Sequence, residues 1–167
     1  MSVKFLRIDD RLIHGQVCVA WVKSYQAKRV LIVDTAVSKD TFLIDVMKMV
    51  APSGIELAVE PCENVEELVA KYDNDDKNTI ILVKTPEVAE ALFDGGLKIQ
   101  SLNVGGMGAK KERSQLYKNV SASESEVETL KRLEARGIDV YFQTTPSNAV
   151  VCLLYTSDAA DDLTRVD

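Results

Sequence analysis

The residues best suited to chemistry lie near the amino terminus, in the stretch RIDDRLIHGQ at positions 7–16. It contains His14, the only histidine of the chain, with Arg7 and Arg11 before it. A neutral imidazole is nucleophilic and can carry a covalent group, and guanidinium groups bind phosphate through paired hydrogen bonds. This combination predicts a histidine that accepts a phosphoryl group beside two cationic side chains.

Backbone and carboxylate groups complete the predicted site. A helix is expected to begin at Gly15, and the unpaired N–H groups of Gly15 and Gln16 are suited to bind phosphate there. Asp9 and Asp10 are suited to hold an arginine, or to accept a hydrogen bond from one ring nitrogen of His14 and so fix its tautomer. The chemistry alone leaves an alternative open, in which a charged surface loop contains a histidine by chance.

The elements that position these residues follow from the hydrophobic pattern, in which apolar runs of strand length alternate with segments of helical period. Strands are expected at 3–8, 29–34, 55–60, 79–84, 98–106, 115–120 and 138–143, and helices at 15–25, 38–50 (with Ser38 as N-cap), 63–72, 86–96 and 123–137. Strands that are apolar on both faces predict a parallel sheet covered on both sides. The expected fold class is α/β, a single-domain, open and mostly parallel β-sheet with helices on both faces.

In such folds, ligands bind beyond the carboxyl ends of the strands. That edge should contain residues 7–14 after the first strand and the glycine-rich stretch NVGGMGAKK, residues 103–111, after the fifth. The backbone of Gly105 and Gly106 could cradle a phosphate. The stretch has the spacing of neither a Walker A loop nor a dinucleotide-binding glycine motif, so an ordinary tight turn is the alternative.

Composition argues against several classes of protein. The net charge of −6 disfavours nucleic acid or an anionic membrane surface as the main partner. No apolar run reaches the roughly 18 residues needed to span a bilayer, and the amino terminus lacks the pattern of a signal peptide. The cysteines Cys18, Cys62 and Cys152 are widely spaced, so no metal site and no cofactor are expected. We therefore expect a cytoplasmic protein.

Four stretches carry a resemblance to a known family: RIDDRLIHGQV (7–17), PSGIE (52–56), LNVGGM (102–107) and KRLEARGI (131–138). Together they resemble the IIB components of the mannose/fructose/sorbose family of the bacterial phosphoenolpyruvate-dependent sugar phosphotransferase system (PTS). The resemblance covers residues 1–150, and its first motif is the longest and most specific.

This resemblance implies that His14 is the phosphorylated residue, through Nδ1, with Arg7 and Arg11 as its flanking arginines and Asp9 ordering the loop. The family receives its phosphoryl group from a IIA domain and passes it to sugar presented by membrane IIC and IID subunits. The chain would then be a phosphotransferase component that needs no metal. It is expected in the cytoplasm, peripherally associated with the membrane through IIC and IID. The oligomeric state stays open on the sequence, with a homodimer as one alternative.

Two other functions remain open on the sequence alone. One is a small-anion or nucleotide-binding module at the same edge, and the other is a regulatory module in which phosphorylated His14 only signals. The sequence does not indicate which sugar is involved. Residues 110–118 hold four basic residues and one acidic residue, and Lys110, Lys111 and Arg113 could steer an acidic partner; a solvated loop is the alternative.

The end of the chain departs from the family pattern. The segment CLLYTSDAADDLTRVD, residues 152–167, is polar and acidic after a short apolar start, and it lacks sustained helical periodicity. It resembles translated sequencing-adaptor sequence. We therefore expect a IIB domain at residues 1–150 and a non-native tail at 151–167, which gives Cys152 no role.

Overall fold

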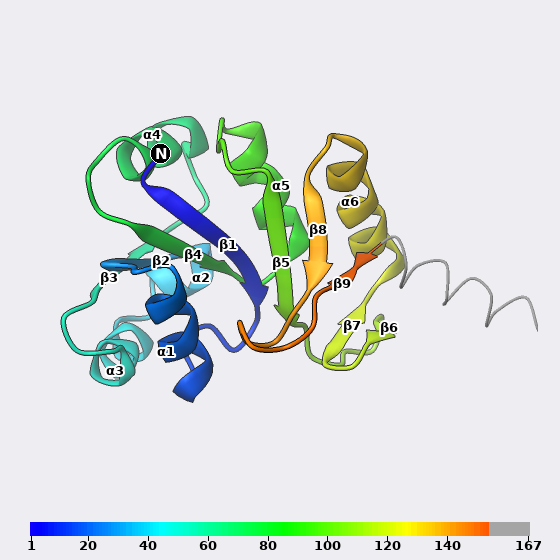
Figure 1. The fold of residues 1–167 in the computed structure, drawn as a ribbon, viewed down its shortest axis with the longest axis horizontal. Helices are drawn as coiled ribbons and strands as arrows, with labels where there is room; N and C mark the ends of the chain where they lie inside the picture. The colour runs from blue at the N-terminus through cyan, green and yellow to red at the C-terminus, as the bar shows by residue number, and fades with distance from the viewer. Residues whose placement is uncertain (154–167) are drawn as a thin grey trace, which may run out of the picture.

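The computed structural model describes residues 1–153, whose main feature is a seven-stranded sheet in the order β3-β2-β4-β1-β5-β8-β9 (Figure 1). Its strands are β1 (Val3–Asp9), β2 (Arg29–Val33), β3 (Glu56–Glu60), β4 (Thr79–Val83), β5 (Ser101–Gly106), β8 (Asp139–Phe142) and β9 (Val151–Cys152). All neighbours pair in parallel except β8 and β9, which are antiparallel. The mostly parallel sheet is the one that the apolar runs predict.

Helices cover both faces of the sheet. On one face, α1 (Gly15–Ser24), α2 (Thr35–Ser38) and α3 (Thr41–Val50) contribute to a core that includes Trp21 and Met47. On the other, α4 (Val65–Asp73), α5 (Pro86–Asp94) and α6 (Glu124–Ala135) contribute to a second core that includes Leu92 and Leu130. The α/β fold class, with helices on both faces, is confirmed.

The predicted helix 38–50 is wrong in its first turn, because the chain forms two helices there. Asp34 caps α2 and Asp40 caps α3, each by accepting a hydrogen bond from a backbone N–H three residues further on. Ser38 is the last residue of α2 rather than an N-cap, and its hydroxyl donates to the carbonyl oxygen of Thr35 at 2.6 Å. Two aspartates with strong capping preference therefore outcompete the serine between them.

The single strand predicted at 115–120 is also wrong. The chain forms an antiparallel hairpin of β6 (Ser114–Tyr117) and β7 (Val120–Ala122), which is separate from the main sheet. Lys118 and Asn119 form the turn between them. Asparagine is a favoured turn residue, so the polar pair interrupts what the apolar pattern suggested was one strand.

The strand β9 was not predicted from the sequence. Val151 and Cys152 pair with Phe142 and Tyr141 of β8, and the following Leu153 is fully buried. The first residues of the predicted tail therefore pack on the sheet, whereas residues 154–167 of that tail lie outside the described part of the chain.

The strand order places the end of β1 where ligands bind in such folds. The chain leaves β1 for α1 on one face, whereas the chain leaving its neighbour β4 enters α5 on the other. In open α/β sheets, ligands bind at the carboxyl edge where neighbouring connections diverge in this way. The loop that carries His14 begins at this point.

Candidate active site

The loop between β1 and α1 is anchored by its own apolar residues. Leu12 and Ile13 are buried in the core beneath α1, although the residues on either side of them are more exposed. Leu12 adopts a positive φ of 58°, a conformation that a leucine rarely takes and that surrounding contacts must hold. His14 follows as the N-cap residue of α1 with an extended backbone. The loop therefore presents the imidazole, whose side chain is 24% exposed, from a fixed base.

Asp9 is the centre of the site and is fully buried. One carboxylate oxygen, Oδ2, accepts hydrogen bonds at 3.0 Å from Arg7 Nη2, Arg11 Nη2 and His14 Nε2. The other, Oδ1, accepts from Arg11 through Nε at 2.9 Å and the backbone N–H at 3.1 Å. Burial alone would raise the pKa of Asp9, but the hydrogen bonds from Arg11 and His14 and the charge of Arg7 lower it overall. The carboxylate is therefore ionised.

The hydrogen bond to Asp9 decides which nitrogen of His14 is reactive. An ionised carboxylate can only accept hydrogen bonds, so Nε2 of the imidazole carries the proton that it donates. In the neutral ring, Nδ1 then keeps its free electron pair and is the nucleophilic atom. The structure therefore brings the predicted orienting carboxylate and the predicted acceptor histidine together.

The two arginines of the predicted site differ in exposure. The side chain of Arg7 is only 2% exposed and lies over the Trp21 ring, with its guanidinium carbon 5.5 Å from the ring centroid. Burial lowers the pKa of Arg7, and Asp9 partly opposes that shift. The side chain of Arg11 is 45% exposed, and its hydrogen bond to Asp9 raises its pKa. Arg11 is therefore the arginine placed to meet an incoming anion.

The glycines predicted to cradle phosphate lie directly against these guanidinium groups. A Cβ atom added to Gly105 would lie 1.9 Å from Cζ of Arg7, and one added to Gly106 would lie 2.9 Å from Nη2 of Arg11. Side chains at either position would displace an arginine. The close approach of the arginines thus explains both glycines, and their contact with phosphate stays a prediction.

Gly15 and Gln16 lie at the other side of the site, exposed in the first turn of α1. Gly15 has a positive φ of 42°, which a glycine adopts without strain. The first N–H groups of a helix have no partner within the helix and attract anions. The structure places both residues beside His14, where the sequence predicts phosphate binding.

Asp10 and Arg113 form a second network that the sequence did not reveal. Asp10 accepts a hydrogen bond from the Gly108 N–H at 2.6 Å and lies 3.7 Å from Nη1 of Arg113. Arg113 also donates two hydrogen bonds of 2.8 Å to Glu126, which closes the capping box of α6 with Ser123. Its side chain is only 2% exposed. This pairing inside the protein disfavours the predicted steering role of Arg113, which stays a prediction for Lys110 and Lys111.

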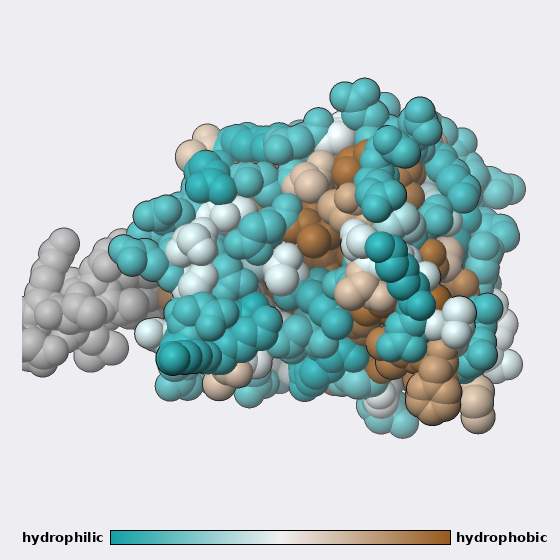
Figure 2. Space-filling model, turned by 180° about the vertical axis from the view of Figure 1, so that it is seen from behind, coloured by the Kyte–Doolittle hydropathy of each residue, from teal (hydrophilic) through white to brown (hydrophobic). Residues whose placement is uncertain are grey.

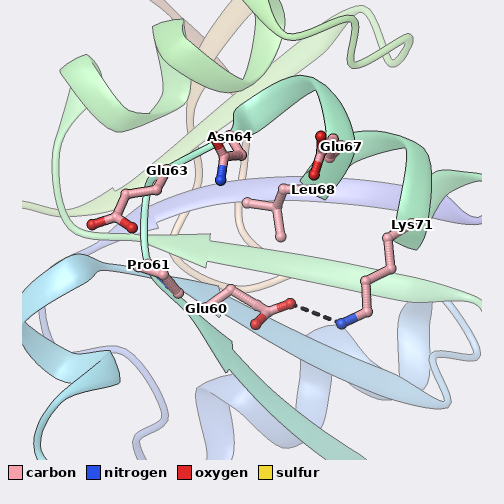
Figure 3. Close-up of a pocket in the computed structure, with 7 residues that line it drawn as sticks. All are labelled: Glu60, Pro61, Glu63, Asn64, Glu67, Leu68 and Lys71. Carbon is pink, nitrogen blue, oxygen red and sulfur yellow. Dashed lines mark hydrogen bonds and ion pairs between the residues drawn. The ribbon is translucent and has the colours of Figure 1, made fainter.

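A separate hollow of about 200 Å³ lies at the carboxyl end of β3 (Figure 3), and His14 is not among its lining residues. Its lining includes Glu60, Glu63 and Glu67 together with Lys71, whose ammonium group pairs with Glu60 at 3.1 Å. Carboxylates repel phosphate, and the one lysine is already neutralised. This hollow does not favour the alternative of a small-anion or nucleotide site.

Two further observations concern the described residues 1–153. No helix among them combines the length and apolar composition that crossing a membrane would require. No group of three or more histidine, cysteine or acidic side chains within this range gathers in a way that could hold a metal ion.

The fold and the site define a class: open α/β proteins that present one oriented imidazole as a carrier of a covalent group. The family can be stated more closely. A model of the family "PTS system sorbose subfamily IIB component" matches residues 3–156, and the chain belongs to this family. The predicted family is confirmed, and the match extends beyond the domain limit of 150 predicted from the sequence.

Known relatives agree with this assignment. The chain is 36% identical over 143 residues to the mannose-specific EIIAB component of Escherichia coli K12, covering 84% of this chain but only 43% of that protein. It is 31% identical to the sorbose-specific EIIB component of Lacticaseibacillus casei, covering 90% of this chain and 94% of the relative. The structure of the IIBSor domain of the sorbose permease from Klebsiella pneumoniae superposes with a TM-score of 0.87 at 30% identity, over 95% and 98% of the two chains.

Proposed function

We propose that this chain is a phosphohistidine carrier in sugar uptake. It accepts a phosphoryl group from a IIA domain on Nδ1 of His14 and passes it to a sugar bound by membrane IIC and IID subunits. The observation that carries the proposal is the 3.0 Å hydrogen bond between His14 Nε2 and the buried carboxylate of Asp9. This bond leaves Nδ1 as the free nucleophile of a partly exposed ring.

Each transfer forms one bond to phosphorus and breaks another. Nδ1 attacks the phosphorus atom of the donor phosphohistidine, and the donor imidazole leaves as its bond to phosphorus breaks. In the second transfer, a sugar hydroxyl oxygen forms a bond to phosphorus and its proton passes to water, while the bond between phosphorus and His14 Nδ1 breaks and the neutral imidazole leaves. Asp9 stabilises the positive charge that the phosphorylated ring carries, since its carboxylate accepts the hydrogen bond from Nε2–H throughout.

Catalysis of phosphoryl transfer depends on positioning and on charge stabilisation. Arg11 is the exposed cation of this network, and we propose that its guanidinium group binds the phosphoryl oxygens. The N–H groups of Gly15 and Gln16 would add hydrogen bonds at the helix start. Arg7 is buried behind Asp9 and acts through that carboxylate. We propose that Gly105 and Gly106 belong to the phosphate site, because their lack of a side chain leaves room for the guanidinium groups of Arg7 and Arg11.

Labelling tests the first transfer. Wild-type protein incubated with labelled phosphoenolpyruvate, the general PTS carriers and a IIA domain should acquire acid-labile phosphate, and His14→Ala should acquire none. His14 is the only histidine, so the label has one possible histidine acceptor. Circular dichroism of the variant serves as the control for folding. Labelling that persists in His14→Ala would contradict the proposal.

Transfer to sugar separates the carrier from the alternatives. With vesicles that contain the cognate IIC and IID subunits, label should move from His14 to sugar. Phosphorylation without such transfer would favour the regulatory module. Binding of phosphate or nucleotide without any phosphorylation would favour the small-anion module.

The donor is expected to meet exposed lysines near the site. Lys110 and Lys111 are exposed and follow the β5 turn, whereas Arg113 is paired internally. Complementary charges raise encounter rates at low ionic strength. The double change Lys110→Glu and Lys111→Glu should slow transfer from a IIA domain about tenfold at low salt, with the difference vanishing in high salt. Equal rates at every salt concentration would exclude steering.

We propose that the homodimer uses the exposed apolar face of α3. Phe42 and Met49 are 77% and 84% exposed, and Val46 and Val50 extend the same face. Figure 2 views the protein from behind, so that α3, at the lower left of Figure 1, lies at the lower right. Apolar surface is exposed at that place. A two-fold dimer needs a patch that can pair with itself. Sedimentation should show a dimer for wild type and a monomer for Phe42→Glu/Met49→Glu; the same mass for both would contradict this contact.

Two predictions from the sequence join these proposals. We propose a cytoplasmic location with peripheral membrane association through IIC and IID, which fractionation of cells with and without those subunits tests. We also propose that a foreign tail replaces the native end of the chain from about residue 151; the pairing of Val151 and Cys152 with β8 and the family match to residue 156 argue for a start further along. The intact mass of the protein expressed from natural genomic DNA tests the tail, because a native product ending in this sequence would contradict it.

A further inference from the structure

Arg7 lies in a row of paired residues that crosses the sheet. The parallel register pairs Ile32 with Leu82, Leu82 with Arg7, Arg7 with Asn103, and Asn103 with Tyr141. Paired residues of neighbouring strands point to the same face. The row is apolar on β2 and β4 and becomes polar from β1 onward. A buried arginine at this change requires partners from β5 and beyond.

Those partners bind the two terminal nitrogen atoms of the Arg7 guanidinium group separately. Nη1 donates to Oδ1 of Asn103 in a short hydrogen bond and to the carbonyl oxygen of Gln143 at 2.9 Å. Nη2 donates to Oδ2 of Asp9 at 3.0 Å. Because the guanidinium is planar and rigid, the anchors on Nη1 determine where Nη2 meets Asp9.

The Asn103 side chain is itself held in one orientation. It is fully buried, and its Nδ2 donates to the Gln143 carbonyl at 3.2 Å. A flipped amide would place its NH₂ group against the donors of Arg7, which no amide tolerates when buried. Asn103 thus offers a neutral oxygen at a fixed point. An ionised side chain at this position would instead compete with Asp9 for the charge of Arg7.

We propose that Asn103 is a positioning residue for phosphoryl transfer: it fixes Arg7, which fixes Asp9, which holds His14 with Nδ1 free. Gly105 assists from the other side, because a Cβ there would occupy the place of the Arg7 guanidinium. The inference deepens the proposed carrier function and rests on it for its catalytic consequence. Its structural part, the orientation of the ring, can be tested without any transfer.

The lone histidine makes this test direct. In protein labelled with nitrogen-15, long-range proton–nitrogen spectra report the tautomer of the single imidazole. At about pH 9 an ordinary imidazole, with a pKa of about 6.5, is neutral. Wild type should then show the tautomer protonated at Nε2. Asn103→Leu removes the acceptor for Nη1, and we expect a mixture of the two tautomers.

The matched control is Thr79→Val, which removes another buried polar group from the sheet. Thr79 is fully buried on β4 and accepts a hydrogen bond from Arg29 at 3.0 Å, at the opposite end of the strands. This change should lower stability and leave the His14 tautomer as in wild type. Should Asn103→Leu fail to fold, Gly105→Ala displaces Arg7 with Asn103 intact and should give the same mixed spectrum.

Transfer kinetics supply the second readout. Asn103→Leu should lower kcat for acceptance of the phosphoryl group about 10- to 100-fold, the usual effect of misplacing a reacting group. KM for the IIA donor should not change, since Asn103 is buried. An unchanged wild-type tautomer in both Asn103→Leu and Gly105→Ala would overturn the inference. If wild type accepts no phosphate while the spectra change as expected, the carrier function fails and the positioning network stands.

Discussion

Two buried arginines lie at opposite ends of the same sheet, and they have different consequences. Arg7 is 1% exposed near the carboxyl end of β1, and Arg29 is 4% exposed at the start of β2. Each lies over an aromatic ring, with the guanidinium carbon 5.5 Å from the centroid of Trp21 and 4.7 Å from that of Tyr72. Burial and stacking are therefore common to both and cannot by themselves mark a functional site.

The difference is where each hydrogen-bond network ends. Arg29 donates to Thr79 Oγ1 and pairs with Asp75, whose side chain is 34% exposed to water. Arg7 pairs with Asp9, which is fully buried and also holds the partly exposed ring of His14. The Arg29 network joins strands and ends in solvent, whereas the Arg7 network ends at the imidazole that we propose as the nucleophile. The comparison teaches that a buried charge indicates function only when its network reaches a reactive group.

Neutralising Asp9 or Asp75, the carboxylates that pair with Arg7 and Arg29, should give the largest difference in rate and stability between the two networks. Asp9→Asn removes the acceptor that orients the ring, and loss of an orienting carboxylate costs about 10³- to 10⁴-fold in rate. It also leaves buried cations unpaired, at about 3–5 kcal/mol of stability. Asp75→Asn should cost less, about 1–2 kcal/mol, because Asp75 is 34% exposed and the buried Arg29 keeps its hydrogen bond to Thr79. Phosphoryl labelling and urea unfolding of both variants measure the contrast, and equal losses would erase it.

Replacing the arginines themselves should separate stability from chemistry. Arg29→Met and Arg7→Met each leave buried acceptors without a donor, which should lower the free energy of unfolding by about 2–4 kcal/mol. Only Arg7→Met should also slow phosphoryl acceptance, by about 10- to 100-fold per folded molecule. Rates normalised to the folded fraction provide the measurement. A comparable slowing in Arg29→Met would mean that the two networks are coupled.

The sequence predicted the site well where its members are close together in the chain. Asp9, Arg11 and His14 lie within one loop, so their contact follows from spacing and from the chemistry of each group. The parallel sheet could also be predicted from the sequence, because strands buried on both faces form continuous apolar runs. Trp21 of α1 joins the core on one face of this sheet, where it stacks on Phe5 with ring centroids 4.4 Å apart.

Long-range partners could not be predicted in this way. Asn103 reaches Arg7 across 96 positions of sequence, and Gln143 contributes a backbone carbonyl that no side-chain motif reveals. Arg113 resembles its exposed neighbours Lys110 and Lys111 in charge alone, and only the fold brings it to its partner in α6. The register of the sheet, rather than the type of residue, decides these contacts.

The smallest difference between the two networks should appear in how the stability of the protein depends on pH in acid. The pKa of Asp9 is lowered because its hydrogen bonds and the charge of Arg7 outweigh burial, and the pKa of Asp75 is lowered by Arg29 despite some desolvation. A carboxyl whose pKa falls on folding stabilises the protein above its unfolded pKa of about 3.9, and this stability is lost as the pH falls through the folded pKa. Unfolding of wild type and both Asp→Asn variants between about pH 6 and pH 2 measures each share. The wild-type advantage over Asp9→Asn should shrink below about pH 4, with a smaller change for Asp75→Asn, whose carboxylate is partly in water. An acid response as large for Asp75 as for Asp9 would place the two arginine networks in one class.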